Sequence, residues 1–94
     1  MAIDFSKRVV VPDTVIIRRL DDESVILDLA TESYFGLDDV GASMWAHVVA
    51  TDSIEAACAA LLNEYEVEPD QLRADMADFL EQLVEKGLLE IRGG

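Results

Sequence analysis

The sequence predicts a small α+β domain in which a three-stranded antiparallel sheet is followed by three helices. Residues 14–37 hold short runs of β-branched and aromatic residues separated by polar turns, a pattern typical of strands joined as hairpins. Residues 38–86 instead place apolar residues three and four positions apart, which is the period of amphipathic helices. The length of 94 residues is sufficient for one such domain and too short for two.

Three strands are expected in the first part of the chain. The run TVIIRRL (residues 14–20) is the first, and after the polar turn DDES the run VILDLA (residues 25–30) returns beside it. The turn TES then leads into YFGL (residues 34–37), a short third strand that lies at the edge of a simple meander. Residues 1–13 are interpreted as a tail, because Pro12 interrupts regular structure before the first strand.

Three helices are expected to follow. The first has Asp38 as its N-cap and runs to about residue 50, and the second follows Asp52 in a variant of the capping box. Pro69 suits the first turn of the third helix, and Gly87 is a natural stop after it. The predicted apolar stripes are Val40, Met44, Trp45 and Val48 in the first helix, Ile54, Ala57, Cys58, Leu61, Leu62 and Tyr65 in the second, and Leu72, Met76, Phe79, Leu80, Leu83 and Val84 in the third.

Three amphipathic helices beside a small sheet form the winged helix-turn-helix arrangement, since the helices and one face of the sheet need a common core. Residues 88–92 then form a final short strand or an extended tail. Winged helices most often bind DNA, but a net charge of −13, from 20 acidic and 7 basic residues, opposes binding of nucleic acid. The same charge disfavours anionic membranes, and no stretch reads as a membrane span or a signal peptide, so a cytoplasmic location is expected.

Few residues in the sequence suggest catalysis or the binding of a metal or cofactor. His47 is the single histidine and has no partner with the spacing of a triad or a metal site. Cys58 lies on the apolar stripe of the second helix and is interpreted as a packed, unreactive thiol, in keeping with a reducing compartment. Asp28 interrupts the run VILDLA, and we expect it on the outer, partly wet face of its strand. No cofactor and no metal are expected, and an enzyme is the least favoured function.

The third strand is the most suggestive feature of the sequence. SYFGL (residues 33–37) contains neither the Lys nor the Pro with which many proteins protect an edge strand. An extended peptide can add to such an edge, with the third helix as the opposite wall of a groove. The alternatives are an edge that is tolerated because it is short, an edge that the N-terminal tail covers, or an edge through which two copies pair.

The stretch VILDLATESYFGLDDVGASMWAHV resembles the PqqD-like family, whose pattern joins an LLD strand and a polar turn to YF-L-(N/D)-x-x-G-x-x-(I/M)-W. The later segments LLNEYEV and DMADFLEQLVEKGLL are similar to the rest of the family pattern, so the resemblance covers about residues 9–91 of a single domain, 1–94. Asp38 stands where Asn is commoner, and the turn TES lacks the Gly often found there.

The resemblance implies a RiPP recognition element, which is a non-enzymatic module for ribosomally synthesised and post-translationally modified peptides. Such a module binds the leader of a precursor peptide by strand addition and presents it to a modifying enzyme such as a radical SAM protein, a leader peptidase or a cyclase. Carried over to this chain, the resemblance assigns peptide binding to the third strand and the third helix, at Ser33, Tyr34, Phe35, Gly36, Leu37, Leu72, Arg73, Met76 and Leu80.

Two alternatives remain open beside this interpretation. One is the role for which the family is named, as a peptide chaperone for a radical SAM enzyme in pyrroloquinoline quinone biosynthesis. The other is a winged-helix transcriptional regulator, which the charge opposes. The expected partners are a leader peptide and a modifying enzyme, without nucleic acid or membrane, and the expected oligomeric state is a monomer or weak dimer.

Overall fold

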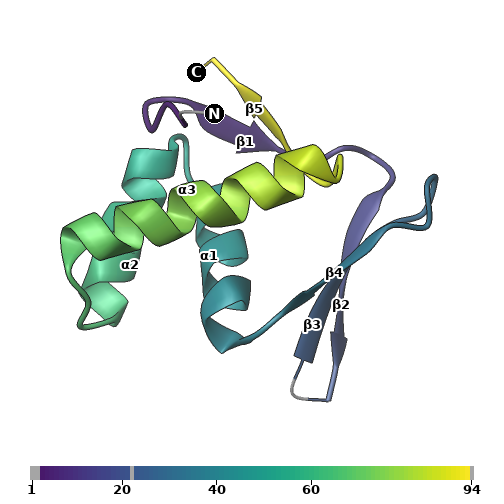
Figure 1. Ribbon diagram of the computed structural model, residues 1–94, viewed down its shortest axis with the longest axis horizontal. Coiled ribbons are helices and arrows are strands. Elements are labelled where there is room, and N and C mark those ends of the chain that lie inside the picture. The colour runs from purple at the N-terminus through teal and green to yellow at the C-terminus, as the bar shows by residue number, and fades with distance from the viewer. Residues whose placement is uncertain (1–2, 22, 94) are drawn as a thin grey trace.

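The computed structural model describes residues 3–21 and 23–93, and these residues form the expected sheet and helices together with a second, two-stranded sheet (Figure 1). The three-stranded antiparallel sheet has the order β2 (Val15–Leu20), β3 (Glu23–Asp28), β4 (Tyr34–Leu37). The helices are α1 (Asp39–Ala50), α2 (Ile54–Glu64) and α3 (Pro69–Glu85), and the second sheet pairs β1 (Arg8–Val10) with β5 (Glu90–Arg92). The predicted α+β fold of winged helix-turn-helix type is confirmed.

The strand register divides the three-stranded sheet into two faces, because successive side chains alternate. The inner face, toward the helices, carries Val15, Ile17, Arg19, Ser24, Ile26, Asp28, Phe35 and Leu37, and the outer face carries Ile16, Arg18, Leu20, Glu23, Val25, Leu27, Tyr34 and Gly36. Leu20 pairs with Glu23, so the first turn is tighter than predicted and residues 23 and 24 belong to β3. Asp22, in the middle of the predicted turn, lies outside the described residues.

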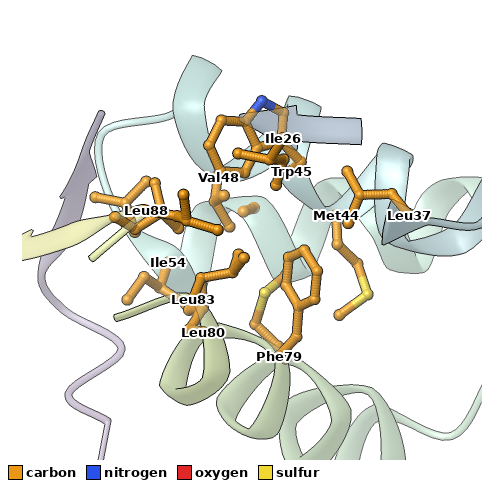
Figure 2. Packing of buried hydrophobic residues seen from close by; sticks show 14 of the residues in the cluster. Ile26, Leu37, Met44, Trp45, Val48, Ile54, Phe79, Leu80, Leu83 and Leu88 are labelled. Atoms are coloured by element: carbon orange, nitrogen blue, oxygen red, sulfur yellow. The ribbon is translucent and has the colours of Figure 1, made fainter. Parts of the chain in front are cut away.

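The hydrophobic core lies between the inner face and the three helices. Side chains from α1, α3, β3 and the segment after α3 converge there, as Figure 2 shows. Ile26 and Leu80 are completely buried, and Trp45 retains only 5% of its surface. The predicted role of Trp45 as a core residue is therefore confirmed. The core holds α3 in a fixed position relative to β4, which matters for the site described below.

The N-terminal segment is not the simple tail that the sequence suggested. Residues 8–10 form β1, whose antiparallel partner is β5, so residues 90–92 are a strand as well. The backbone carbonyls of Phe5 and Lys7 accept hydrogen bonds from the N–H groups of Glu55 and Ile54, at 2.9 and 2.8 Å. These bonds satisfy N–H groups in the first turn of α2 that lack partners within the helix. The described part of the N-terminal segment therefore packs on α2 and β5 and does not cover the edge of β4.

The helix ends follow the capping rules, with one correction. Asp38 caps α1 as predicted, since its carboxylate accepts a hydrogen bond at 2.7 Å from the N–H group three residues later. The cap of α2 is Ser53 rather than Asp52, because the Ser53 hydroxyl accepts the N–H group three residues later, at 3.0 Å. Pro69 occupies the first turn of α3 as predicted, and Gly87 ends that helix with a φ of +74°.

Two predicted exposures are wrong. Asp28 lies on the inner face in line with Ile26 and is only 7% exposed. A hydrogen bond from the N–H group of Ala30, at 2.9 Å, together with one from the Thr14 hydroxyl, lowers the pKa of the Asp28 carboxyl below its usual value. Val40 is 50% exposed, because the first turn of α1 extends past the core toward the open side of α3.

Candidate functional site

The edge of β4 presents unpaired backbone groups to solvent. The N–H group of Asp28 donates to the carbonyl of Ser33 at 2.9 Å, so these two residues form a hydrogen-bonded pair of the ladder. Bonded and non-bonded pairs alternate in an antiparallel ladder, so Phe35 and Leu37 bond to β3 while Tyr34 and Gly36 direct their N–H and C=O groups away from it. No strand in the described part of the chain pairs with this open side, which we call the β4 edge.

A groove runs from the β4 edge to α3. Its larger hollow has a volume of about 580 Å³ and its smaller one about 280 Å³, and the two share Asp38, Gly41 and Phe79. We call them together the β4–α3 groove, lined by Glu23, Phe35, Gly36, Leu37, Asp38, Asp39, Val40, Gly41, Met44, Asp75, Asp78, Phe79 and Gln82. The groove lies directly beside the strand that has free backbone groups.

The floor of the β4–α3 groove is aromatic. The ring of Phe79 meets the ring of Phe35 edge to face, with centroids 6.2 Å apart and planes at 73°. Phe79 extends from α3 toward the part of the core that holds Met44 and Leu37 (Figure 2). Such a floor provides apolar surface against which a side chain of a bound segment gains about 1.5–3 kcal/mol when fully buried.

The rim of the groove is acidic. Five carboxylates line it, those of Glu23, Asp38, Asp39, Asp75 and Asp78, and no lysine or arginine is among the lining residues. Asp38 is engaged as the cap of α1, and Asp78 accepts a hydrogen bond from the side-chain amide of its neighbour four residues later on α3. Negative charges gathered in a concave surface attract a cationic ligand and raise its rate of encounter.

The structure places the predicted strand residues at the open edge, with different orientations. Tyr34 points to the outer face and is 69% exposed, and it is not among the residues that line the groove. Phe35 and Leu37 point to the inner face, where Leu37 is buried and Phe35 is partly buried. A Cβ atom added at Gly36 would meet nothing within 4 Å, so no other atom of the described chain crowds the strand at this position. Ser33 precedes the strand and bonds to β3 through its carbonyl.

The predicted residues of the third helix are not among those that line the groove, and their part in peptide binding stays a prediction. Leu72, Met76 and Leu80 are 6%, 0% and 0% exposed, because they form the stripe that packs into the core. Arg73 lies on the opposite flank of α3, where its guanidinium stacks at 4.1 Å from the centroid of the Phe5 ring. In this structure these four side chains therefore lie in the core or against the N-terminal segment rather than beside β4.

The wall that α3 contributes to the groove comes from the neighbouring stripe, Asp75, Asp78, Phe79 and Gln82. These residues are spaced by three and four positions, so they share one face of the helix. The spacing was visible in the sequence, but Phe79 was assigned only to the apolar stripe that packs into the core. Phe79 is 8% exposed and contributes to both the core and the groove.

The other residues singled out in the sequence form no catalytic arrangement. His47 hydrogen-bonds to Glu64 on the neighbouring helix. Burial raises the pKa of the Cys58 thiol, which disfavours the reactive thiolate. Within residues 3–21 and 23–93, no group of three or more His, Cys, Asp or Glu side chains is arranged to hold a metal ion. No helix in the described ranges is long and apolar enough to span a membrane.

Comparison with known proteins agrees with this geometry. Residues 23–89, from the start of β3 to the residue before β5, match the model of the family described as coenzyme PQQ synthesis protein D (PqqD). The chain belongs to the PqqD family. A solved structure described as TbiB1 in complex with the TbiA(beta) leader peptide is 39% identical to this PqqD-family chain, covers 85% of it and 93% of its own length, and has a TM-score of 0.77.

A second solved structure extends the comparison of the fold. It is described as lasso peptide synthetase B1 complexed with the leader peptide, and it is 24% identical, covers 88% of this chain and 98% of its own length, with a TM-score of 0.79. No curated protein sequence matches the chain. The resemblance to the PqqD-like family and the fold expected from it are thereby confirmed.

Proposed function

We propose that this PqqD-family chain is a stand-alone recognition element that binds the leader of a ribosomally synthesised precursor peptide and presents the peptide to a modifying enzyme. The observation that supports this most strongly is the unpaired β4 edge beside a groove with an aromatic floor. The chain is also 39% identical to TbiB1, whose solved structure includes a leader peptide.

In the proposed mode of binding, the leader adds to the sheet as a further strand along the β4 edge. The N–H and C=O groups of Tyr34 and Gly36 pair with its backbone, and each such hydrogen bond contributes about 0.5–1.5 kcal/mol. Main-chain pairing gives affinity without regard to sequence. Selectivity therefore comes from the side chains of the leader that point toward the inner side, over Phe35 and Phe79.

The acidic rim favours a leader that carries Lys or Arg next to an apolar anchor. The apolar side chain is placed on the aromatic floor, and the basic side chain lies among the carboxylates of Asp38, Asp75 and Asp78. An acidic leader would bring like charges together in the groove and bind more weakly. The net charge of −13 acts in the same direction over longer distances.

The chain itself makes and breaks no bonds in this proposal. Its contribution is to order a flexible leader, so that the remainder of the peptide is held near the enzyme at a raised effective concentration. This role needs no cofactor or metal, and we place it in the cytoplasm, where precursor peptides are synthesised.

The family model is described as a coenzyme PQQ synthesis protein, and a second candidate is therefore a role in that synthesis, in which the chain binds the precursor of pyrroloquinoline quinone. It uses the same groove and differs only in the peptide bound. A third, DNA binding through α3, is opposed by Asp75 and Asp78 on the open flank of that helix, since phosphates repel carboxylates. A gel shift with duplex DNA separates this third candidate from the other two.

The proposed function is tested by fluorescence anisotropy with two labelled leaders, that of a precursor encoded beside the gene and the TbiA(beta) leader, and with the labelled peptide precursor of pyrroloquinoline quinone. The core half of the encoded precursor is the matched control. We expect saturable binding of the encoded leader at micromolar concentration or below, and none of the core half. Absence of binding of both leaders at several hundred micromolar would contradict the proposal. Tighter binding of the pyrroloquinoline quinone precursor than of the encoded leader would support the second candidate.

A further inference from the structure

The outer face of the sheet β2–β3–β4 is apolar although it is open to solvent. Ile16, Leu27 and Tyr34 lie directly opposite one another across the three strands and form a continuous row. Tyr34 is 69% exposed, and Leu20, on the same face, is 57% exposed. Val25 also belongs to this outer face, and Leu29, 64% exposed, follows β3 at its end.

No helix of the described chain covers this face, on which Ile16, Val25 and Leu27 are half-buried and Leu20 and Tyr34 are exposed. All three helices lie on the other side of the sheet (Figure 1), and the buried members of β3 are those that point toward the helices. In an antiparallel sheet with one solvent-exposed face, apolar residues that point inward normally alternate along each strand with polar residues that point outward. Among the described strand residues of this outer face, Arg18 and Glu23 alone carry charged side chains. A contiguous exposed apolar surface of this kind indicates an interaction site.

We propose that the outer face is the docking surface for the modifying enzyme that acts on the bound peptide, an inference that rests on the proposed function. The reason is continuity with the β4 edge, since Tyr34 belongs to the outer face through its side chain and to the edge through its backbone. A leader added along β4 alternates its side chains between the two sides of the sheet and thereby extends the outer face by one strand. An enzyme seated there contacts the recognition element and the leader together.

The occupant of the outer face is a different protein rather than a second copy of this chain. Each copy carries a net charge of −13, and Asp21, Glu23 and Glu32 stand at the ends of the strands, so two outer faces brought together place acidic residues against one another. The partner surface that fits is an apolar patch edged by Lys or Arg. The apolar patch of such a partner packs on the apolar row, and its Lys or Arg side chains lie against the acidic residues at the ends of the strands.

The proposal is tested with a double variant of the outer face and a single-substitution control on the inner face. The double variant Ile16→Thr/Leu27→Thr makes the outer face polar, and threonine keeps the preference for a strand. Ile17→Thr is the matched control, because Ile17 is adjacent in sequence, 46% exposed and on the opposite face. Binding to the modifying enzyme encoded beside the gene is measured by biolayer interferometry, and leader binding by anisotropy. We expect the double variant to bind the enzyme at least about tenfold more weakly, with the control and all leader affinities unchanged within about twofold.

Each outcome decides a specific point. Unchanged enzyme binding by the folded double variant, or an equal loss in the Ile17→Thr control, would overturn the proposal. A wild-type dimer in sedimentation equilibrium that the double variant dissociates would assign the face to a second copy instead. If the double variant fails to fold, Leu20→Thr/Leu29→Thr gives the same test with two strongly exposed residues. Failure of the wild-type chain to bind leader, with selective loss of enzyme binding, would contradict the proposed function and support the docking surface.

Discussion

Replacing Gly36 by proline tests strand addition at one backbone group. The N–H group of Gly36 points away from β3, so its loss removes a donor from the β4 edge and none from the β3–β4 ladder. Proline is tolerated in edge strands at such positions, and the residue before it, Phe35, already has the extended backbone that proline requires. The matched control is Gly36→Ala, because a Cβ atom there meets nothing within 4 Å and alanine keeps the N–H group.

The expected loss follows from one missing hydrogen bond. The bond itself contributes about 0.5–1.5 kcal/mol, and the leader carbonyl left without a donor costs about 1–3 kcal/mol more. Even the low end of this sum, about 1.5 kcal/mol, weakens leader binding roughly tenfold. Gly36→Ala should change the Kd by no more than about twofold.

The assay is anisotropy titration with the labelled leader, with thermal unfolding followed by circular dichroism to show that both variants fold. If Gly36→Pro is folded and binds leader as tightly as the wild-type chain, the leader does not pair with the β4 edge. If Gly36→Ala weakens binding as much as proline does, the effect arises from the side chain and not from the lost donor.

Three further predictions concern charge, backbone conformation and pH. Asp75→Asn/Asp78→Asn should slow the association of the leader several-fold at low ionic strength and only slightly at high ionic strength, as measured by stopped-flow mixing. Equal slowing at both ionic strengths would exclude electrostatic steering. Gly87→Ala should lower the free energy of unfolding by about 1–2 kcal/mol in urea titration, because φ is +74°, whereas Gly93→Ala, in open space, should not. Because the pKa of the Asp28 carboxyl is lowered in the folded chain, the ionised carboxylate stabilises the fold. This stabilisation is complete above the unfolded pKa of about 3.9 and is lost as the pH falls through the pKa of the folded state. Thermal melts should therefore show the difference in Tm between wild type and Asp28→Asn shrinking as pH falls below about 4, and a constant difference would contradict this.

Much of the fold was predictable because its signals are local. The apolar period of the helices and the turn residues between strands are properties of neighbouring residues, and they gave the correct order of strands and helices in residues 14–87. The edge position of β4 followed from the short connections of a meander. Asp38 and Pro69 were recognised from the chemistry of helix N-termini alone.

The errors arose where a decision depended on distant parts of the chain. Three residues of β1 pair with β5, which lies about eighty positions later, and neither segment is long enough to give a strand signal by itself. The alternation of side chains in β3 correctly put Asp28 and Leu27 on opposite faces of the sheet. Which of the two faces packs against the helices is decided by the tertiary structure. The same holds for α3, where the period defines the stripe containing Met76 while only the tertiary structure shows that the stripe containing Asp75 and Phe79 faces β4.

Amide hydrogen exchange at Tyr34 and Gly36, measured by NMR with and without the leader, tests strand addition most directly. In the free chain these two N–H groups point to the open side of β4, whereas those of Phe35 and Leu37 bond to β3. We predict that saturating leader slows exchange at Tyr34 and Gly36 by at least about tenfold, the effect of a newly formed backbone hydrogen bond. A leader that binds while exchange at both residues stays unchanged would contradict strand addition at β4.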